Sequence, residues 1–184
     1  MPQTISVSDA VSVLQQGRVI AYPTESIYGL GCDPWNPDAV SCLLDLKLRS
    51  IESGFILVAA SFDQVESLVE SVPQEKMDKV MATWPGHTTW LFPAKHDVPT
   101  CLRGNHQTIA LRISSHPVIK ALCQGFGGPI ISTSANITDH PPARSAYDCY
   151  VHFHHELSDI VEGDLGDESN PSEIRDVMSG DIIR

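Results

Sequence analysis

The sequence predicts an α/β fold, with a mixed sheet and flanking helices in a single domain that spans residues 1–184. Short apolar runs alternate with helix-like segments along the chain, and this alternation favours helices layered on a sheet. The stretch from Thr88 to Ile113 reads as a hairpin, which indicates a mixed sheet and not a purely parallel one. The length of 184 residues, with 42% hydrophobic and 19% charged residues, suits one domain with one core.

The helices are predicted from the residues that cap them. Asn36, Pro37 and Asp38 supply a cap, a proline at the first helical position and an acid near the positive helix end. A helix is therefore expected from this point to about Lys47. Further helices are expected from Ser8 to about Gln16, after Ser61 with Gln64 as a capping box, from Gln74 to about Thr83, from Pro117 to about Gly125, and from Ser145 to His154.

The strands are predicted from short apolar runs. Val19 to Tyr22 is one such run and stops at Pro23, while Phe55 to Ala59 reads as a buried strand. Further strands are expected at 88–92, 108–113 and 130–132, with one or two short strands in the C-terminal tail.

The chain is strongly acidic. It carries 12 Lys and Arg against 23 Asp and Glu, for a net charge of -11. This balance argues against tight, sequence-independent binding of nucleic acid, which needs a basic surface. Residues 151–184 hold nine acids and two bases, and a solvated acidic surface is the favoured interpretation of that tail.

The sequence indicates a cytoplasmic location. The N-terminal residues lack the basic start and apolar stretch of a secretory signal, and no apolar run approaches the roughly 20 residues of a membrane helix. The five cysteines are scattered and form no CxxC pair, so we expect reduced thiols and no metal bound by cysteines.

Three polar clusters follow strand-like or helical runs. Residues 22–31 offer hydroxyls, an aromatic ring and two glycines after a buried strand, which suits a ligand loop or an ordinary turn. Lys47 and Arg49 end an apolar helix, where they could bind phosphate or simply complement the helix dipole. Residues 131–136 end a strand in three hydroxyls and an amide, which could face a ligand or satisfy a turn.

Other candidates are weaker. Arg112 lies inside the apolar run 109–113, where a charge should be paired or should point into a site. Arg144 follows two prolines on a predicted loop. His152, His154 and His155 could bind a metal, although a solvated or capping cluster is favoured because the spacing fits none of the common zinc patterns. The chain contains neither a Walker A motif nor a GxGxxG motif, so any nucleotide would be bound in another way.

The polar clusters, taken in this order, resemble the YrdC-like family, and within it the bacterial threonylcarbamoyl-AMP synthases. The family has a K-x-R element and an S-x-N element, matched here by Lys47 with Arg49 and by Ser134 with Asn136. Further blocks similar to the family are AYPTESIYGLG (21–31), ALRI (110–113), ISTSAN (131–136) and NPSEIRD (170–176). The resemblance implies a twisted α/β fold around a concave, positively lined cavity.

The resemblance also implies a reaction. L-threonine, bicarbonate and ATP would give threonylcarbamoyl-AMP and pyrophosphate, for the t6A modification of adenosine 37 in ANN-decoding tRNA. Mg²⁺ is expected with the ATP, and no tightly bound protein metal. The expected partners are other proteins of the t6A pathway, which would bind transiently; contact with tRNA would be weak or indirect, and none with a membrane is expected.

The resemblance implies roles for individual residues. The implied catalytic residues are Lys47, Arg49, Ser134 and Asn136. The implied ATP-binding residues are Arg49, Ser53, Thr108, Ser134, Asn136, Arg144 and Arg184. The implied threonine-binding residues are Thr24, Arg112, Ser132 and Ser172. The chain departs from the family pattern at Ser50, where a proline is common, and at Val58, where some relatives carry histidine.

Two other functions compete with the synthase. An RNA-binding or ribosome-maturation factor could use the same cavity without nucleotidyl transfer, although the net charge of -11 counts against it. A carbamoyltransferase module, like the related domain of hydrogenase-maturation proteins, is disfavoured because the companion acylphosphatase and zinc-finger segments are missing.

Overall fold

The computed structural model describes residues 3–153 and 156–184. Within these ranges nine strands form a sheet. The strands are β1 (Thr4–Ile5), β2 (Ile20–Pro23), β3 (Tyr28–Gly31), β4 (Ile56–Ala59), β5 (Thr88–Pro93), β6 (Thr108–Ile113), β7 (Ile130–Ser134), β8 (Ile160–Val161) and β9 (Glu173–Asp176). The helices are α1 (Val7–Gln15), α2 (Pro37–Lys47), α3 (Gln74–Met81), α4 (Thr100–Arg103), α5 (Pro117–Phe126) and α6 (Ala146–Phe153), with short 3₁₀ helices η1 (Ile51–Ser53), η2 (Phe62–Gln64) and η3 (Glu66–Leu68).

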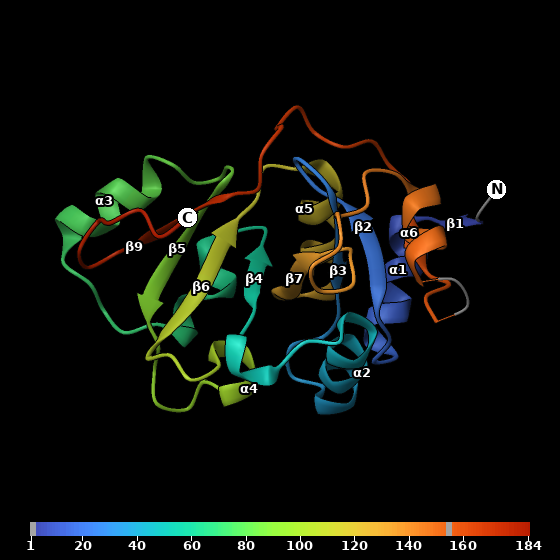
Figure 1. Ribbon diagram of the computed structural model, residues 1–184. Helices are drawn as coiled ribbons and strands as arrows, with labels where there is room; N and C mark the ends of the chain where they lie inside the picture. Colours follow the sequence, from blue (N-terminus) through green and yellow to red (C-terminus); the bar gives the residue numbers. More distant parts are fainter. Residues whose placement is uncertain (1–2, 154–155) are drawn as a thin grey trace.

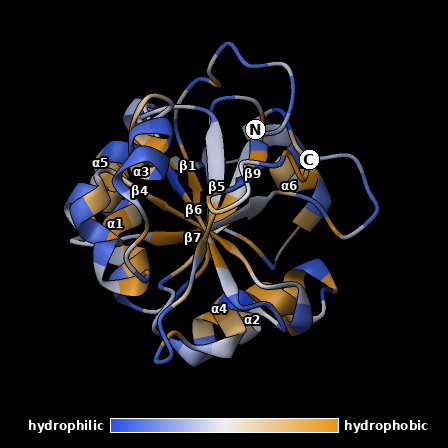
Figure 2. Cartoon of the chain, turned by 90° about the vertical axis from the view of Figure 1, so that its left-hand side faces the viewer, coloured by the Kyte–Doolittle hydropathy of each residue, from blue (hydrophilic) through white to orange (hydrophobic). Residues whose placement is uncertain are grey.

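The sheet is mixed, as predicted. Its strand order is β1-β8-β2-β3-β7-β4-β6-β5-β9. The pair β4 and β6 is parallel, whereas β5 and β6 are antiparallel, and the latter pair is the predicted hairpin-like stretch. Helices α1 and α5 lie on one side of the sheet, and α2 and α4 lie on another (Figure 2). The α/β class with flanking helices is therefore confirmed.

Alternating side chains of the strands supply two cores. Ile20 and Tyr22 of β2 pack with Ile119 and Leu122 of α5 in one apolar cluster, whereas Ala21 belongs to the other cluster. This separation follows from the two-residue period of a strand, which sends neighbouring side chains to opposite faces. Because both faces are covered, the strands read as continuous apolar runs.

The predicted capping residue begins α2, whereas α1 begins earlier in the chain than predicted. The Asn36 side chain accepts hydrogen bonds from the Asp38 and Ala39 N–H groups and begins α2, as predicted. The first helix begins earlier than predicted, because Ser6 and not Ser8 is its cap and accepts a hydrogen bond from the Asp9 N–H.

The helix predicted after Ser61 is wrong. Two three-residue 3₁₀ helices, η2 and η3, take its place. The Gln64 side chain is drawn away from a capping role, because its oxygen accepts from the Ala60 N–H at 2.8 Å and its amide donates to the Cys123 carbonyl at 3.0 Å. These bonds tie the segment to the end of β4 and to α5 instead of starting a regular helix.

The described ranges contain no helix long and apolar enough to cross a membrane. The cysteines are all free thiols: Cys32, Cys42, Cys101, Cys123 and Cys149.

The chain crosses from one part of the sheet to the other after β8. The segment between β8 and β9 leaves the α6 side and runs across to β5, where β9 pairs with β5 in parallel (Figure 1). The C-terminal residues thereby come close to the loop that joins β2 and β3, since the Gly166 N–H donates to the Thr24 carbonyl and the Glu168 N–H to the Glu25 carbonyl.

Candidate active site

A cavity of about 470 Å³ brings most of the predicted site residues together. Among those residues, the following line it: Thr24, Arg49, Ser53, Thr108, Arg112, Ser132, Ser134, Asn136, Ser172 and Arg184. They come from the β2–β3 loop, the end of α2, η1, β6, β7 and the C-terminal segment. Two predicted residues, Lys47 and Arg144, lie outside this lining.

Lys47 is buried behind the cavity, with 2% of its surface exposed. Its Nζ donates hydrogen bonds to the Ser134 carbonyl at 2.6 Å, the Asn136 carbonyl at 2.7 Å and Asn136 Oδ1 at 3.4 Å. Burial, with the nearby charge of Arg49, lowers the pKa of Lys47 to about 8. The ammonium group thus holds the S-x-N loop at the end of α2, and the catalytic role implied for Lys47 stays a prediction.

Arg49 faces the cavity because the chain turns between the two bases. Leu48 adopts a left-handed conformation with φ of 49° and projects outward, 77% exposed. Arg49 then donates to the Gly54 carbonyl at 2.9 Å and to Thr133 Oγ1 at 3.2 Å. Its guanidinium carbon lies 5.2 Å from the centre of the Phe55 ring, a cation–π contact. Burial first, then the charge of Arg184, lowers the pKa of Arg49, as expected where cations are gathered at a cavity wall.

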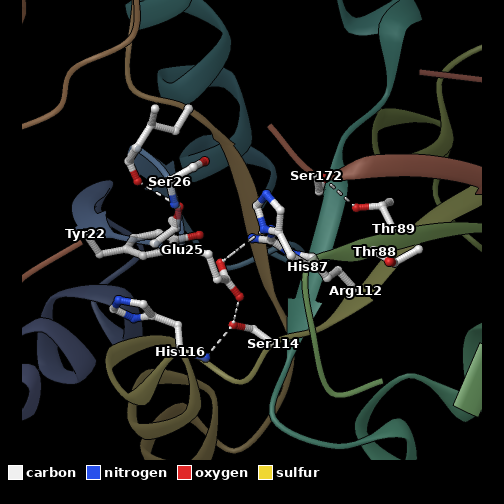
Figure 3. A network of polar contacts seen from close by, with 12 residues as sticks. Tyr22, Glu25, Ser26, His87, Thr88, Thr89, Arg112, Ser114, His116 and Ser172 are labelled. Carbon is white, nitrogen blue, oxygen red and sulfur yellow. Dashed lines mark hydrogen bonds and ion pairs between the residues drawn. The ribbon is translucent and has the colours of Figure 1, made fainter. Parts of the chain in front are cut away.

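Arg112 lies at another part of the wall and is paired with a carboxylate. It is 6% exposed, and its Nη2 lies 3.4 Å from Glu25 Oε2 (Figure 3). Arg112 Nη1 lies 3.3 Å from His87 Nδ1, and His87 Nε2 lies 2.8 Å from the Asn170 carbonyl. Since a carbonyl only accepts and an arginine only donates, His87 is assigned as the neutral tautomer with its proton on Nε2.

Glu25 is held in place by a third contact. Ser114 Oγ donates to Glu25 Oε1 at 2.6 Å, and the same oxygen of Ser114 accepts from the His116 N–H at 3.0 Å. Burial opposes ionisation of this carboxyl, but the Arg112 charge, the Ser114 hydrogen bond and the backbone N–H of Glu25 together keep the pKa of Glu25 below its ordinary value of 4.5.

The remaining predicted threonine-binding residues lie around the same end. Thr24 Oγ1 donates to the Ile27 carbonyl at 2.7 Å and shapes the turn between β2 and β3. Ser172 Oγ lies 2.9 Å from Thr89 Oγ1, and the Ser172 carbonyl accepts from Arg184 Nη2 at 3.3 Å. Arg184, which ends the chain, is therefore tied back to the cavity. Burial, with the charge of Arg112, lowers the pKa of Arg184.

The end of the cavity near Ser53 and Thr108 contains two further polar residues, Arg103 and His106. Arg103 Nη1 donates to the His106 carbonyl at 2.7 Å. Neither residue was singled out from the sequence, because neither lies in a motif. Arg144 is exposed on the loop two residues after the lining residue Pro142, and its N–H donates to Asp148 Oδ2.

Glu25, His87 and Ser114 were also missed by sequence reasoning. One signal was available, because a charge inside the apolar run of Arg112 demanded a partner. The sequence could not say which acid this was, since Glu25 and Arg112 lie far apart along the chain.

The described residues contain no group of three His, Cys, Asp or Glu side chains that could hold a metal ion. His154 and His155 of the predicted histidine cluster lie outside the described residues, while His152 lies in the last turn of α6.

The sequence also matches a known protein family. Residues 12–184 match the Sua5_yciO_yrdC family, which carries the description "Telomere recombination". The chain belongs to the Sua5/YrdC family. The resemblance drawn from the K-x-R and S-x-N elements is therefore confirmed.

Relatives in the Sua5/YrdC family are similar over almost the whole chain. A threonylcarbamoyl-AMP synthase of Coxiella burnetii (strain RSA 493 / Nine Mile phase I) is 49% identical, over 98% of this chain and 97% of its own length. A protein of the same name from Pseudomonas aeruginosa (strain UCBPP-PA14) is 47% identical, over 95% of this chain and 94% of its own.

A solved structure of a Sua5/YrdC protein is also similar. P. abyssi Sua5, complexed with L-threonine, superposes with a TM-score of 0.87 at 27% identity. The match covers 96% of this chain but only 54% of the P. abyssi chain, so this chain spans about half the length of that protein.

Proposed function

We propose that this chain is a threonylcarbamoyl-AMP synthase, an enzyme of the nucleotidyltransferase class that uses L-threonine, bicarbonate and ATP. The observation that carries the proposal is the single cavity into which Arg49, the S-x-N residues and Arg112 all project. Its volume of about 470 Å³ lies within the usual range for small-molecule sites. The relatives named as threonylcarbamoyl-AMP synthases, at 47–49% identity, support the same activity.

The proposed reaction has two steps. The threonine amine attacks the carbon of bicarbonate, and loss of water leaves N-carboxy-threonine. An oxygen of its new carboxylate then attacks the α-phosphorus of ATP, the bond from that phosphorus to the bridging oxygen breaks, and pyrophosphate leaves. Such a transfer needs positioning and charge neutralisation more than a protein nucleophile.

The role of each residue in the proposed reaction follows from its position in the cavity. Arg49 neutralises charge on the phosphates, and Ser134 and Asn136 orient the phosphates or ribose from the loop that Lys47 holds. Arg112 holds the threonine carboxylate by a bidentate contact. Thr24, Ser132 and Ser172 surround the amino acid, whereas Ser53, Thr108 and Arg184 contact the nucleotide. Contact between Arg144 and ATP stays a prediction.

Mg²⁺ would enter with the nucleotide. Among the described residues that line the cavity none is an aspartate or glutamate, the side chains that usually hold Mg²⁺ in proteins. The hydroxyl and amide oxygens of the lining fit a metal that is carried by the phosphates of ATP, where it would offset their charge. The product would serve the t6A modification of tRNA with transient protein partners, in the cytoplasm.

The proposal is tested by pyrophosphate release from ATP, measured with L-threonine and bicarbonate and then with each omitted. Release that continues without L-threonine would contradict the synthase. Arg49→Ala should lower the rate at least tenfold. Arg18→Ala is the matched control, because Arg18 is a surface guanidinium paired with Asp159 away from the cavity, and its rate should stay unchanged.

The competing RNA-binding function predicts a different result from the same preparation. RNA affinity that falls steeply with salt, without threonine-dependent pyrophosphate release, would support it.

A further inference from the structure

We propose that Glu25 is a positioning residue, which aims the guanidinium of Arg112 at the amino-acid end of the cavity. This inference rests on the proposed function, in which Arg112 holds the carboxylate of L-threonine. It concerns a residue that lies behind the cavity wall and has no place in the reaction described above.

Glu25 cannot act on substrate directly. It is 6% exposed and lies outside the cavity lining, and its carboxylate meets the lining residues Arg112 and His87. Among residues 3–153 and 156–184 it is the one acid in the buried class, and both of its oxygens face protein groups. Removing a carboxylate from water is costly unless it is paired, so its retention here needs an explanation.

The contacts of Glu25 fix the direction in which the Arg112 guanidinium points. Ser114 anchors Oε1 at 2.6 Å, and this leaves Oε2 facing Arg112 Nη2 at 3.4 Å. His87, held by the Asn170 carbonyl, meets Arg112 Nη1 at 3.3 Å. Both terminal nitrogens of Arg112 are thus constrained by groups that are themselves constrained (Figure 3).

The third nitrogen of the guanidinium has no protein partner within the described residues. Arg112 Nε is buried and has no hydrogen-bond partner within the described residues, although Arg112 lines the cavity. A buried donor without a partner is costly. Arg112 therefore reaches the cavity through its other atoms, whose direction the Glu25 contact fixes.

Charge and orientation predict opposite effects of losing Glu25. If only charge mattered, its loss would make the cavity more positive, and both ATP and L-threonine would bind more tightly, ATP more so because it carries more negative charge. If Glu25 orients Arg112, its loss weakens L-threonine binding alone, since Arg49 is held by Thr133 and Gly54 and not by Glu25.

Two substitutions separate the effect of side-chain length at position 25 from the effect of its charge. Glu25→Gln keeps the shape but removes the charge, whereas Glu25→Asp keeps the charge but is one methylene too short to reach Ser114 and Arg112 together. Glu168→Gln is the matched control, because Glu168 is an exposed acid whose backbone adjoins Glu25.

The test is calorimetric titration of the full chain with L-threonine and, separately, with ATP. We expect the dissociation constant for L-threonine to rise about tenfold in both Glu25 variants, as small misplacements of a positioning group do. The constant for ATP should stay within about twofold, and Glu168→Gln should match the wild type for both ligands. Thermal unfolding of each variant verifies that it is folded at the titration temperature.

The outcomes distinguish this inference from the proposed function. If the wild type binds L-threonine and either Glu25 variant binds it equally well, the inference alone is overturned. Tighter binding of both ligands in Glu25→Gln would overturn it in favour of a pure charge effect. A wild-type protein that binds no L-threonine would overturn the proposed function, and the inference with it.

Discussion

The two ends of the cavity hold their cations in different ways. Near the S-x-N loop, Lys47 and Arg49 are held by carbonyl and hydroxyl oxygens, which carry no net charge. Near β6, Arg112 is held by the carboxylate of Glu25. The first end therefore keeps its positive charge for a ligand, whereas at the second end a carboxylate offsets the charge of Arg112, beside which Arg184 adds a further cation. A polyphosphate suits the first end and a zwitterionic amino acid suits the second.

The largest effect is expected from Lys47→Met, which tests whether carbonyl oxygens really hold the first end together. The substitution removes the Nζ donor that the Ser134 and Asn136 carbonyls share, so that the Ser134 carbonyl keeps only backbone donors such as the Asn136 N–H, and the loss of a charged hydrogen-bond donor is destabilising. We expect the free energy of unfolding, measured with urea, to fall by about 3 kcal/mol. Lys79→Met, at an exposed position of α3, is the control and should change it by no more than about 0.5 kcal/mol.

The next effect concerns Arg49, whose charge should be available to the ligand. Arg49→Ala is expected to lower kcat/KM for ATP about 100-fold, the usual loss when a fixed donor to developing charge is removed. Arg49→Lys keeps the charge but cannot bridge Gly54 and Thr133, so its loss should be smaller, about tenfold. A loss below threefold for Arg49→Ala would show that the phosphates lie elsewhere.

A smaller effect is expected from Glu25→Gln, which removes the charge balance at the second end. Because the pKa of Glu25 is lowered in the folded protein, the carboxylate stabilises the fold above the unfolded-state pKa of about 4.5. The substitution should cost about 2 kcal/mol at pH 7, since it leaves the buried Arg112 without its charged partner. As the pH falls through the lowered pKa, Glu25 becomes protonated and the difference between the two proteins should vanish. Urea unfolding at a series of pH values from 7 downward measures this, and a difference that did not shrink as the pH falls below about 4.5 would exclude the charge as its cause.

The smallest effect is the response to salt. Raising KCl from about 0.05 M to about 0.3 M should increase KM for ATP about two- to threefold, because the first end attracts its ligand by net charge. KM for L-threonine should change by less than about 1.5-fold, because the zwitterionic amino acid carries no net charge. Steady-state kinetics with one substrate saturating gives both values, and equal salt dependence would remove the distinction between the ends.

The sequence predicted the fold class and most strands because these depend on local signals. The apolar runs of β4 and β6 and the Asn36 cap of α2 act within a few residues. The helix after Ser61 failed because distant contacts of Gln64 with Cys123 outweighed a local capping pattern. Strand β3 was read as part of a possible ligand loop, because YGLG has little strand character until β2 and β7 pair with it. That residues 1–184 form a single domain stays a prediction.

By itself, the sequence determined the family, the order of the motifs and the residue types at the cavity, since each is written in short stretches of the chain. Only the tertiary structure decided which of those residues face the cavity. It placed Arg49 at the wall but Lys47 behind it, and it paired Arg112 with Glu25 and His87. The physical reason is that a buried charge takes its partner from whatever the fold brings within about 4 Å, and sequence spacing carries no information on such long-range neighbours.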